Sequence, residues 1–598
     1  MATTGDIKFE GVPYRINLSS YHVKDIVDFS PRASVSGGSS FMSDLGLMQP
    51  LVQTDWQHGF GFHWNTDSSG YMHTDGNVDT RQDGLAMLYT QSVSSDTNNN
   101  SKSGFTTFNG ALYAWGAAGL RKYSGGSWTL PYSAAAVNYA LATGDYLFFC
   151  PDGARIQKMD TSGTITDAGL DSSSTDYKWL VIHNGYIYAG KDGTNKVHYS
   201  SDSALADLEG TTADLGIIYC GLGNIPTIGA AVYAGILYIA RQDGLWALGE
   251  DNIARRVIDY SGQVSANNFR SMVEINGMFI FPIRDRIVQW NGSRVADVTP
   301  MKVTDTFPYV TYGTYKGFVS VDNFLYCIGR TNETTYREHL LCWDGVGWHK
   351  LQDIVTNGSD SVTAMGYDVV NNYIWYHVDS TADATYYIQL QSNSSFPYGN
   401  FPTTGTHSLI TSRMDMGFRR VQKSLTSLFV DVANVTANRY IKVYYALDGG
   451  SWTFWSNVTT NGTVELTSPG GSTSIQFTYI QFRFDFVTDS SAQSPILEGY
   501  CLIFIMRPDV RYGYSFDIVI STNLEYEGEV DTRTAADIAS ALRTLRDSKA
   551  PITLTNLIGE SVLGYLSAIR ENPVSRTLDQ DAGTDSIEYI MSVSFVAI

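Results

Sequence analysis

A phrase that recurs along much of the chain constrains the fold more than any other sequence feature. In VIHNGYIYAGKDGTNKVHYSSD, residues 181–202, an apolar pair precedes Asn184-Gly185, and a Tyr/Ile run leads to a second turn at Lys191-Asp192-Gly193. Related phrases follow one another at intervals of about 35 to 50 residues. Their first turns start near Asn109, Gly144, Asn184, Ala234, Asn276, Asp322 and Asn371.

Each phrase has the pattern of a small antiparallel sheet. Asn-Gly and Asp-Gly tolerate the positive φ that a tight hairpin turn needs. Continuous apolar runs such as Tyr186-Ile187-Tyr188 suit a strand buried on both faces. A single sheet of this kind exposes two apolar faces, whereas a closed ring of sheets buries them. The repeat therefore predicts a β-propeller over residues 105–405, with about seven blades and with six or eight as alternatives.

An array of β-sandwiches with coincidental turns is the competing interpretation of the repeat. A helical repeat is excluded because no 3.6-residue periodicity accompanies these phrases. The composition agrees with an all-β protein, since 13% of the 598 residues are aromatic and 55 are Gly.

Charge and cysteine content narrow the functional classes. The formal net charge of −20 argues against a nucleic-acid partner, because phosphate-binding surfaces concentrate Lys and Arg. The five cysteines form no CxxC, so we expect buried free thiols rather than disulfides or structural zinc. We see neither a signal peptide at the N-terminus nor a run of 18 apolar residues, and we expect a protein made in the cytoplasm without a transmembrane segment.

Residues 1–104 lack the repeat and predict an N-terminal arm or assembly segment. The stretch QSVSSDTNNNSKSG, residues 91–104, has the composition of a linker. Aromatic residues are concentrated between residues 56 and 84. We expect these to become ordered against the array or a neighbouring subunit, and the candidate interaction residues are Trp56, Phe60, Phe62 and Trp64.

The repeat stops near residue 405, and two further domains are predicted. Strand-like runs, including an alternating run from Tyr479 to Phe486, indicate a β-sandwich over residues 406–510. In residues 511–598, Thr534 and Asp537 form the start of a capping box. An apolar stripe with helical spacing follows, and strands flank it, so we expect a small β-barrel with one helix.

Two groups of polar residues raise the question of a metal site. His58, His63 and His73 lie near Asp55, Asp67, Asp75 and Asp79, but their spacing matches no standard zinc pattern. The run from Asp75 to Asp83 resembles the start of a calcium loop, but Thr80 and Ala86 occupy positions where an EF-hand needs Gly and Glu. We interpret both groups as polar surface residues and turns, and predict no metal and no cofactor.

No catalytic motif is evident, and the chain is not predicted to be an enzyme. Leu447-Asp448-Gly449-Gly450-Ser451-Trp452 resembles the Asp-box turn of sialidase-like propellers, but it occurs once and outside the repeat, so we interpret it as a hairpin turn. The tryptophans at blade positions could stack on sugars at a rim, but packing between blades is the favoured interpretation. They are Trp115, Trp128, Trp246, Trp290, Trp343, Trp348 and Trp375.

The order of these parts resembles β-propeller-containing tail-tip or baseplate virion proteins of long-tailed bacteriophages. The resemblance rests on the NG-x-h-Y phrases, on Thr411-Ser412-Arg413 with the DGGSW turn, and on the closing RTAADIASALRTLRDSKAPITLTNLIGESVLGYLSAI. The opening FSPR and DTRQDGLAML phrases add to it. It implies a virion structural protein that forms a homo-oligomer of three- or six-fold symmetry with other tail or baseplate proteins. It implies no active site.

The leading hypothesis is therefore a tail component synthesised in the host cytoplasm, with a role in attachment to a host receptor or glycan. Two alternatives remain open. One is a glycan hydrolase or depolymerase that is tail-associated or secreted, because a propeller funnel is a natural pocket. The other is a lectin-like, glycan-binding propeller.

Overall fold

The computed structural model of the chain describes the following residues: 4–27, 48–60, 64–65, 71–82, 84–96, 101–168, 176–200, 216–223, 225–300, 312–332, 335–380, 383–390, 399–418, 421–469, 475–507, 510–521, 524–526, 529–548, 551–578 and 585–597. The chain forms two compact units. One comprises Gln49–Gly417 and Leu425–Phe504, and the other Met1–Met48, Phe418–Ser424 and Ile505–Ile598.

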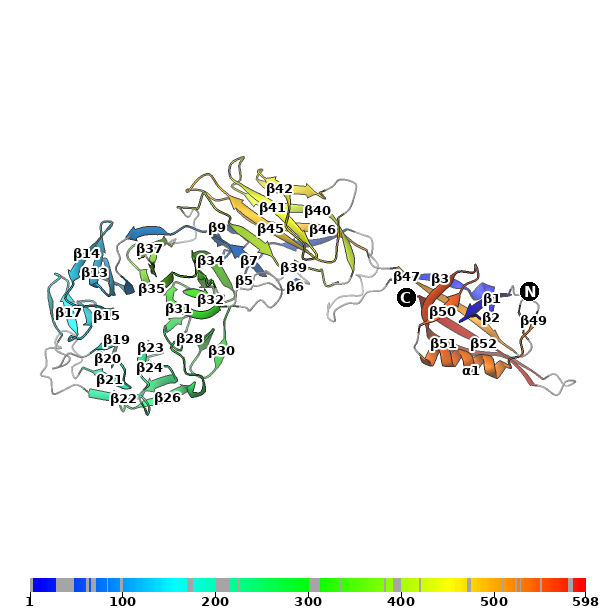
Figure 1. The fold of residues 1–598 in the computed structure, drawn as a ribbon, viewed down its shortest axis with the longest axis horizontal. Helices are drawn as coiled ribbons and strands as arrows, with labels where there is room; N and C mark the ends of the chain where they lie inside the picture. Colours follow the sequence, from blue (N-terminus) through cyan, green and yellow to red (C-terminus); the bar gives the residue numbers. More distant parts are fainter. Residues whose placement is uncertain are drawn as a thin grey trace. The chain divides into compact units, whose positions relative to one another are not determined.

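The larger unit contains a ring of four-stranded antiparallel sheets, which is the arrangement of a β-propeller (Figure 1). The first sheet is β11 (Lys102–Phe108), β12 (Ala111–Gly116), β13 (Gly119–Ser124) and β14 (Ser127–Tyr132). The second is β15 (Val137–Ala142), β16 (Tyr146–Pro151), β17 (Gln157–Asp160) and β18 (Ile165–Asp167). The third is β19 (Tyr177–His183), β20 (Tyr186–Lys191), β21 (Lys196–Tyr199) and β22 (Gly216–Tyr219).

Further sheets continue the ring with the same meander. They are β23 (Thr227–Tyr233), β24 (Ile236–Arg241), β25 (Gly244–Leu248) and β26 (Ala254–Asp259); then, after the 3₁₀ turn Ser261–Gln263, β27 (Val273–Ile275), β28 (Met278–Ile283), β29 (Arg286–Trp290) and β30 (Val295–Asp297). The next is β31 (Tyr312–Val321), β32 (Phe324–Thr331), β33 (Glu338–Trp343) and β34 (Trp348–Val355). The last contains β35 (Ser361–Asp368), β36 (Tyr373–Asp379) and β37 (Ala384–Gln389).

The last sheet takes its fourth strand from the N-terminal side of the ring. This strand is β10 (Val93–Asp96), which pairs antiparallel with β37, from Val93 opposite Tyr387 to Asp96 opposite Thr385. The linker predicted at residues 91–104 therefore contains a strand. Its polar sequence, VSSD, concealed this role, because a short strand at a sheet edge needs backbone pairing more than apolar side chains. The pairing joins the chain before the first sheet to the last sheet.

Aromatic contacts between neighbouring sheets bury their faces. Tyr233 stacks on Phe279 of the next sheet, with ring centroids 5.2 Å apart. Trp375 of the last sheet meets Tyr123 of the first edge-on, with centroids 4.8 Å apart. Six tryptophans of the repeat have at most 9% of their surface exposed, which confirms their packing role: Trp115, Trp246, Trp290, Trp343, Trp348 and Trp375.

Five of the seven predicted hairpin turns start at the residue that the repeat indicated. Asn109, Asn184, Asn276 and Asp322 all have φ between 46° and 52°, in the left-handed region that Asn and Asp tolerate. Ala234 adopts the same conformation, with φ 49°. The turn residues of the sequence therefore set the β-hairpins that join each innermost strand to the second strand of its sheet.

The sheet of β31–β34 continues from the propeller into a second region of the same unit. β5 (Gly59–Phe60) pairs with β34, β7 (Tyr71–Asp75) pairs with β5, and β38 (Ser408–Thr411) pairs with β7. Beyond β38 lie β45 (Ile480–Val487), β41 (Tyr440–Leu447) and β42 (Thr453–Val458), with β39 (Arg413–Met414) and β6 (Trp64–Asn65) at one side. Propeller and sandwich are therefore joined by continuous backbone pairing.

A second sheet packs on β45 and completes a sandwich. It contains β40 (Gln422–Ala433), β43 (Gly462–Thr467), β44 (Gln476–Phe477) and β46 (Ile496–Arg507), together with β4 (Met48–Gln53), β8 (Val78–Asp79) and β9 (Ala86–Leu88). Phe482 and Phe484 on β45 contact Tyr500 on β46, with ring centroids 5.6 Å and 5.5 Å away. The run that indicated a sandwich strand is therefore β45, which is buried along most of its length.

The predicted N-terminal arm, residues 1–104, is divided among several sheets of its own chain. β1 (Thr4–Phe9), β2 (Val12–Asn17) and β3 (His22–Val27) pair with strands of the smaller unit, with the 3₁₀ turn Leu18–Ser20 between the second and third. β4 to β9 belong to the sandwich and its junction, and β10 closes the ring. Short strands that pair with distant parts of the chain carry little pattern of their own, so the sequence did not indicate these partners.

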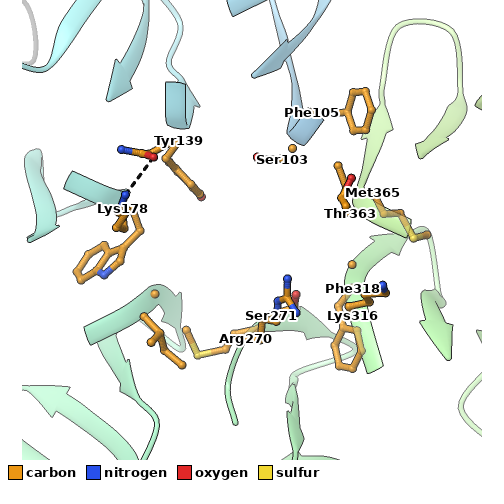
Figure 2. Close-up of a pocket in the computed structure, with 18 of the residues that line it drawn as sticks. Ser103, Phe105, Tyr139, Lys178, Arg270, Ser271, Lys316, Phe318, Thr363 and Met365 are labelled. Carbon is orange, nitrogen blue, oxygen red and sulfur yellow. Dashed lines mark hydrogen bonds between the residues drawn. The ribbon is translucent and has the colours of Figure 1, made fainter. Parts of the chain in front are cut away.

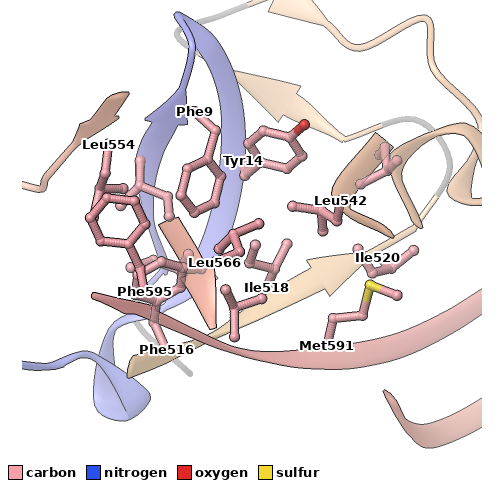
Figure 3. Packing of buried hydrophobic residues seen from close by; sticks show 14 of the residues in the cluster. Phe9, Tyr14, Phe516, Ile518, Ile520, Leu542, Leu554, Leu566, Met591 and Phe595 are labelled. Carbon is pink, nitrogen blue, oxygen red and sulfur yellow. The ribbon is translucent and has the colours of Figure 1, made fainter. Parts of the chain in front are cut away.

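The smaller unit is a seven-stranded sheet with one helix packed on it (Figure 3). Its strand order is β2-β1-β50-β51-β52-β47-β3, where β47 is Val510–Ile520, β50 Ile552–Thr555, β51 Ser561–Leu578 and β52 Asp585–Ala597. β48 (Glu525–Tyr526) and β49 (Glu529–Val530) form a separate hairpin. The core gathers Phe9, Phe516, Leu554 and Phe595 from four different strands.

Helix α1 (Ala535–Ser548) confirms the predicted helix and its cap. The backbone N–H of Asp537 donates to Thr534 Oγ1 at 3.2 Å, and the Thr534 N–H donates to Asp537 Oδ2 at 3.0 Å. Ile538 and Leu542 are fully buried in the core of the smaller unit. The helical stripe that the sequence indicated is therefore the face that packs on the sheet.

Candidate functional site

The innermost strands of the propeller carry a repeated irregularity beside its central channel. One extra residue interrupts the pairing of these strands with their neighbours in five sheets, which makes a β-bulge. The extra residues are Ser103, Asn138, Lys178, Ile228 and Thr363. In β31 the register shifts between Lys316 and Val319. A bulge re-aims side chains, and here the bulged residues line the channel.

Spacing in the sequence marks most of these positions. In six consecutive phrases the channel residue lies six positions before the first turn residue, as Lys178 lies before Asn184. The residues at this position are Ser103, Asn138, Lys178, Ile228, Arg270 and Lys316. These residues were not predicted from the sequence, although their fixed offset from the turn marks them.

The channel encloses a cavity of about 550 Å³ (Figure 2). The channel cations, defined as Lys178, Arg270 and Lys316, lie around it on three different sheets. No Asp or Glu is among its described lining residues. Ser103, Ser271 and Thr363 contribute hydroxyl groups to the wall. The described wall is therefore basic and polar, in a molecule with 60 acidic and 40 basic residues.

Two of the channel cations have acidic partners that are not among the lining residues. Lys178 Nζ lies 3.6 Å from Asp152 and 3.5 Å from Asp192, and donates a hydrogen bond to Asn138 Oδ1 at 3.2 Å. Lys316 Nζ lies 2.8 Å from Glu338 Oε1, and Glu338 is fully buried. These carboxylates balance the charge of both lysines locally.

Lys316 is held in a buried cluster. Its Nζ also donates to Ser361 Oγ at 2.8 Å, while the Val362 N–H donates to Glu338 Oε2 at 2.6 Å. Burial lowers the pKa of Lys316, and Glu338 opposes that shift; the positive charge of Arg270 lowers the pKa further. This electrostatic coupling shows that the two cations lie near enough to repel each other.

Arg270 differs from the two lysines. Its side chain is exposed to the channel, and its guanidinium forms neither an ion pair nor a hydrogen bond with any residue that the structure describes. It precedes β27, next to the buried Phe269, which packs on Phe281 with ring centroids 4.9 Å apart. This packing anchors the backbone that carries Arg270.

A second polar region, the junction cluster, lies where β34 meets β7. We define it as His73, Asp75, His339, Lys350 and Asp353. Lys350 Nζ lies 2.8 Å from Asp353 and 3.5 Å from Asp75, and only 2% of the lysine side chain is exposed. His73 Nε2 lies 3.0 Å from Asp75, and His339 Nε2 lies 3.4 Å from Asp353. Every charged group here faces an opposite charge or a histidine.

Burial sets the protonation of this cluster. Burial, reinforced by the positive charge of Lys350, lowers the pKa of His339 to about 3, so the ring is neutral at pH 7. Tyr312 Oη lies 2.9 Å from His339 Nδ1. Burial alone would raise the pKa of Asp353, but the Lys350 and His339 neighbours hold it below its usual range. The cluster thus combines ionised carboxylates with a neutral imidazole.

Some of the polar residues considered for metal binding, among them His73 and Asp79, form contacts with other residues of the chain. Contrary to the expected surface position, His73 and Asp79 are buried, with 4% and 2% of their surface exposed. Both carboxylate oxygens of Asp79 accept from the Arg81 guanidinium, at 2.9 Å and 2.8 Å. No metal-binding group of His, Cys, Asp or Glu occurs among the described residues, and His63, Asp67 and Asp83 lie outside them.

The predicted interaction residues have different outcomes. Trp56 is 1% exposed and packs against Tyr500, with ring centroids 6.2 Å apart, so its own chain buries it. The predicted ordering of this group against the array or a neighbouring subunit stays a prediction. Phe60 and Trp64 lie in β5 and β6, but their side chains, and the whole of Phe62, lie outside the described residues.

The remaining motifs are structural. Asp448 begins the hairpin turn between β41 and β42, as predicted, and its Oδ1 accepts from the N–H groups of Thr478 and Tyr479 at 2.8 Å and 3.0 Å. All five cysteines are free thiols, and four of them are buried; Cys501 is half-buried. Burial raises the pKa of Cys342 to about 12, so this thiol stays protonated.

Comparisons with known proteins add little to this description. No protein-family model and no curated protein matches the chain. Among solved structures, the WD40 β-propeller domain of Doa1 is 12% identical, with a TM-score of 0.37 over 51% of this chain and 98% of that one. The Neurospora crassa Pan2 WD40 domain is 9% identical, with a TM-score of 0.35 over 49% and 90%. The designed Ika8 protein is 11% identical, with a TM-score of 0.34 over 50% and 100%.

The structure also bears on membrane insertion. Within the part of the chain that it describes, no helix has the length and apolar character needed to cross a bilayer.

Proposed function

We propose that the chain is a structural virion protein of a bacteriophage tail tip or baseplate. It assembles as a three- or six-fold homo-oligomer with other tail proteins and contributes to attachment at the host surface. In this proposal the ring has seven blades, and the smaller unit is a β-barrel with one helix that makes assembly contacts. The role is structural and needs no catalytic residue.

The observation that carries the proposal is the long hairpin of β51 and β52. These strands pair from Gly564 opposite Ala597 as far as Leu578 opposite Asp585. β47 accompanies β52 only as far as Tyr589. Beyond that point no other described strand pairs with the hairpin, and a two-stranded ribbon is marginally stable alone. Its free edges suit pairing with a neighbouring subunit.

Sheet closure supports the barrel interpretation. The strands β2, β1, β50, β51, β52 and β47 follow one another in the sheet, and Ile16 of β2 pairs with Ile518 of β47. That last pairing returns the sheet to its first strand. Closure removes most edges from the smaller unit and leaves β3 and the end of the hairpin as its places for edge contacts.

The channel favours binding over hydrolysis among the alternatives. A glycosidase uses two carboxyl groups at a fixed separation across the bond it cleaves. The described channel wall offers hydroxyls and cations in place of such a pair. A lectin-like role for the propeller is compatible with a tail protein and is the second candidate function.

Antibody labelling of tailed particles tests the location directly. Antibodies raised against the purified chain should decorate the tail tip in negative-stain images of particles from the bacterial culture that produces the protein. A label confined to capsids, or absent from all particles, would contradict the proposal. Antibodies depleted on the purified chain provide the control for specificity.

A hairpin variant tests the assembly role. Replacing residues 574–588 by an Asn-Gly turn between Pro573 and Tyr589 should lower the native mass from an oligomer to a monomer. Helical circular dichroism should be retained, because α1 packs elsewhere on the sheet. Ile558→Ser, at an exposed turn of the same unit, is the matched control. An unchanged oligomer in the shortened variant would show that the hairpin is not the contact.

A further inference from the structure

The channel is a basic site in an acidic protein. The chain carries a formal net charge of −20, yet the charged side chains that line the cavity are the three channel cations. They come from equivalent positions of the repeat on three different sheets. The repeat therefore places three cations from separate parts of the sequence around the same cavity.

The three channel cations differ in how far other described residues satisfy their charge and their N–H donors. Lys178 is balanced by Asp152 and Asp192, and Lys316 by Glu338. The ammonium of Lys316 has three N–H donors, of which Glu338 and Ser361 take two. Arg270 is exposed to the cavity, and its five N–H donors have no acceptor among the described residues. Its charge is the one that the described protein leaves uncompensated in the channel.

We propose that the channel binds an oxyanion, the carboxylate or phosphate of a small acidic ligand, through Arg270 with Ser271 and Lys316 beside it. A guanidinium presents its donors as a planar fork that matches two oxygens of a carboxylate or phosphate. Ser271 and Lys316 line the same cavity as Arg270. The bound anion also relieves the repulsion between Arg270 and Lys316.

The size of the cavity fits a ligand of this class. About 550 Å³ lies within the usual range of small-molecule pockets. The hydroxyls of Ser103 and Thr363, which also line the cavity, provide polar contacts for the remainder of the ligand. This site goes beyond the proposed virion role and stands on channel geometry alone, so binding by the isolated protein can be tested whatever the outcome of particle labelling.

Titration calorimetry at low ionic strength tests the proposal with three probes: inorganic phosphate, D-glucuronate and the neutral sugar D-glucose. The purified full-length chain should bind at least one of the two anions and should not bind D-glucose. Binding of both anions identifies the oxyanion as the shared determinant, whereas binding of one identifies the source. Failure of both anions to bind at concentrations up to about 10 mM, an affinity of only about 3 kcal/mol, overturns the proposal.

Arg270→Gln keeps the size of the side chain and removes its charge. It should weaken anion binding at least about tenfold, the expected loss for a charge-assisted hydrogen-bond pair. Arg270→Lys should retain part of the affinity because it keeps the charge but loses the fork. Arg255→Gln is the matched control, because Arg255 is exposed on the outermost strand β26. Equal weakening by Arg270→Gln and Arg255→Gln would show non-specific attraction and would also overturn the proposal.

Discussion

The channel and the junction cluster are both polar regions of the larger unit, but they use charge in opposite ways. At the junction, Lys350 is 2% exposed and lies between two carboxylates. In the channel, Arg270 is exposed and has no described acceptor. Buried charges are retained where each has a partner, because an unpaired buried ion is costly. An unpaired cation that faces a cavity is inexpensive for the fold and is available for a ligand.

Removing the cation of the junction cluster should lower the free energy of unfolding more than the other substitutions. Lys350→Met removes the cation that Asp353 and Asp75 share, and should lower the free energy of unfolding by about 3 to 5 kcal/mol. Calorimetry or urea denaturation of the full chain measures this loss. Arg286→Gln, which removes an exposed ion pair with Asp297, should change stability by less than about 0.5 kcal/mol. Similar losses in both variants would remove the distinction between buried and exposed pairs.

Acid should weaken the junction before it affects the channel. The pKa of His339 is about 3 in the folded chain and near the ordinary histidine value of 6.5 when unfolded, so the unfolded state binds the proton first. Stability is therefore fully present above about pH 6.5 and should fall by about 2 kcal/mol between pH 6.5 and pH 5. The lowered pKa of Asp353 adds a loss of the same sign below its usual range.

The pH effect is measured by denaturation at a series of pH values. His339→Gln should flatten the change between pH 6.5 and pH 5, even though the variant is less stable overall. His22→Gln, which alters an exposed histidine of β3, should leave the pH profile as in the parent chain. A parent profile that is flat over this interval would mean that His339 is not held neutral by burial.

Lys316 lines the channel as Arg270 does, but it is paired with a buried carboxylate as Lys350 is. Its replacement should therefore have an effect on stability between those of the other two. Lys316→Met leaves the buried Glu338 without its cation, but the Ser361 hydroxyl and the Val362 N–H still donate to that carboxylate. The expected loss of stability is about 1 to 2 kcal/mol, smaller than for Lys350→Met. Lys316→Met with Glu338→Gln should recover part of the loss, which a double-mutant cycle by urea denaturation measures.

Arg270→Gln should have the smallest effect on folding. Because its guanidinium has no described partner, the free energy of unfolding should change by less than about 0.5 kcal/mol. Thermal denaturation of the same preparation used for anion binding measures this. A loss above about 1 kcal/mol would show that Arg270 supports the ring and would place the channel in the same class as the junction.

Much of this fold could be predicted from the sequence, because its signals are local. Asn184-Gly185 and its equivalents fixed the hairpins, and the Thr534–Asp537 pair fixed the start of α1. The strands that the sequence did not reveal are short and depend on partners far along the chain: β10 pairs with β37, and β1 with β50. The polar β10 leaves no apolar pattern to recognise, whereas β1 buries Ile7 and Phe9 but pairs with a strand near the other end of the chain.

The channel residues were missed for a different reason. Five of the six are single polar residues, and the sixth is Ile228, so Lys178 alone has the pattern of an exposed strand position. Their meaning appears only when the phrases are aligned on their turns. The junction was missed because Lys350 and Asp75 are brought together by pairing of β34 and β7 through β5, over a distance that spacing cannot show.

The closure of the ring by β10 has a consequence for synthesis on the ribosome. Val93–Asp96 emerges early, but its partner Ala384–Gln389 is made roughly 290 residues later, which corresponds to roughly 15 to 60 s of translation. Throughout that interval β10 of the nascent chain has no partner strand, and the ring of sheets cannot close. Chaperone dependence and premature truncation should therefore affect this protein most before residue 389 is reached.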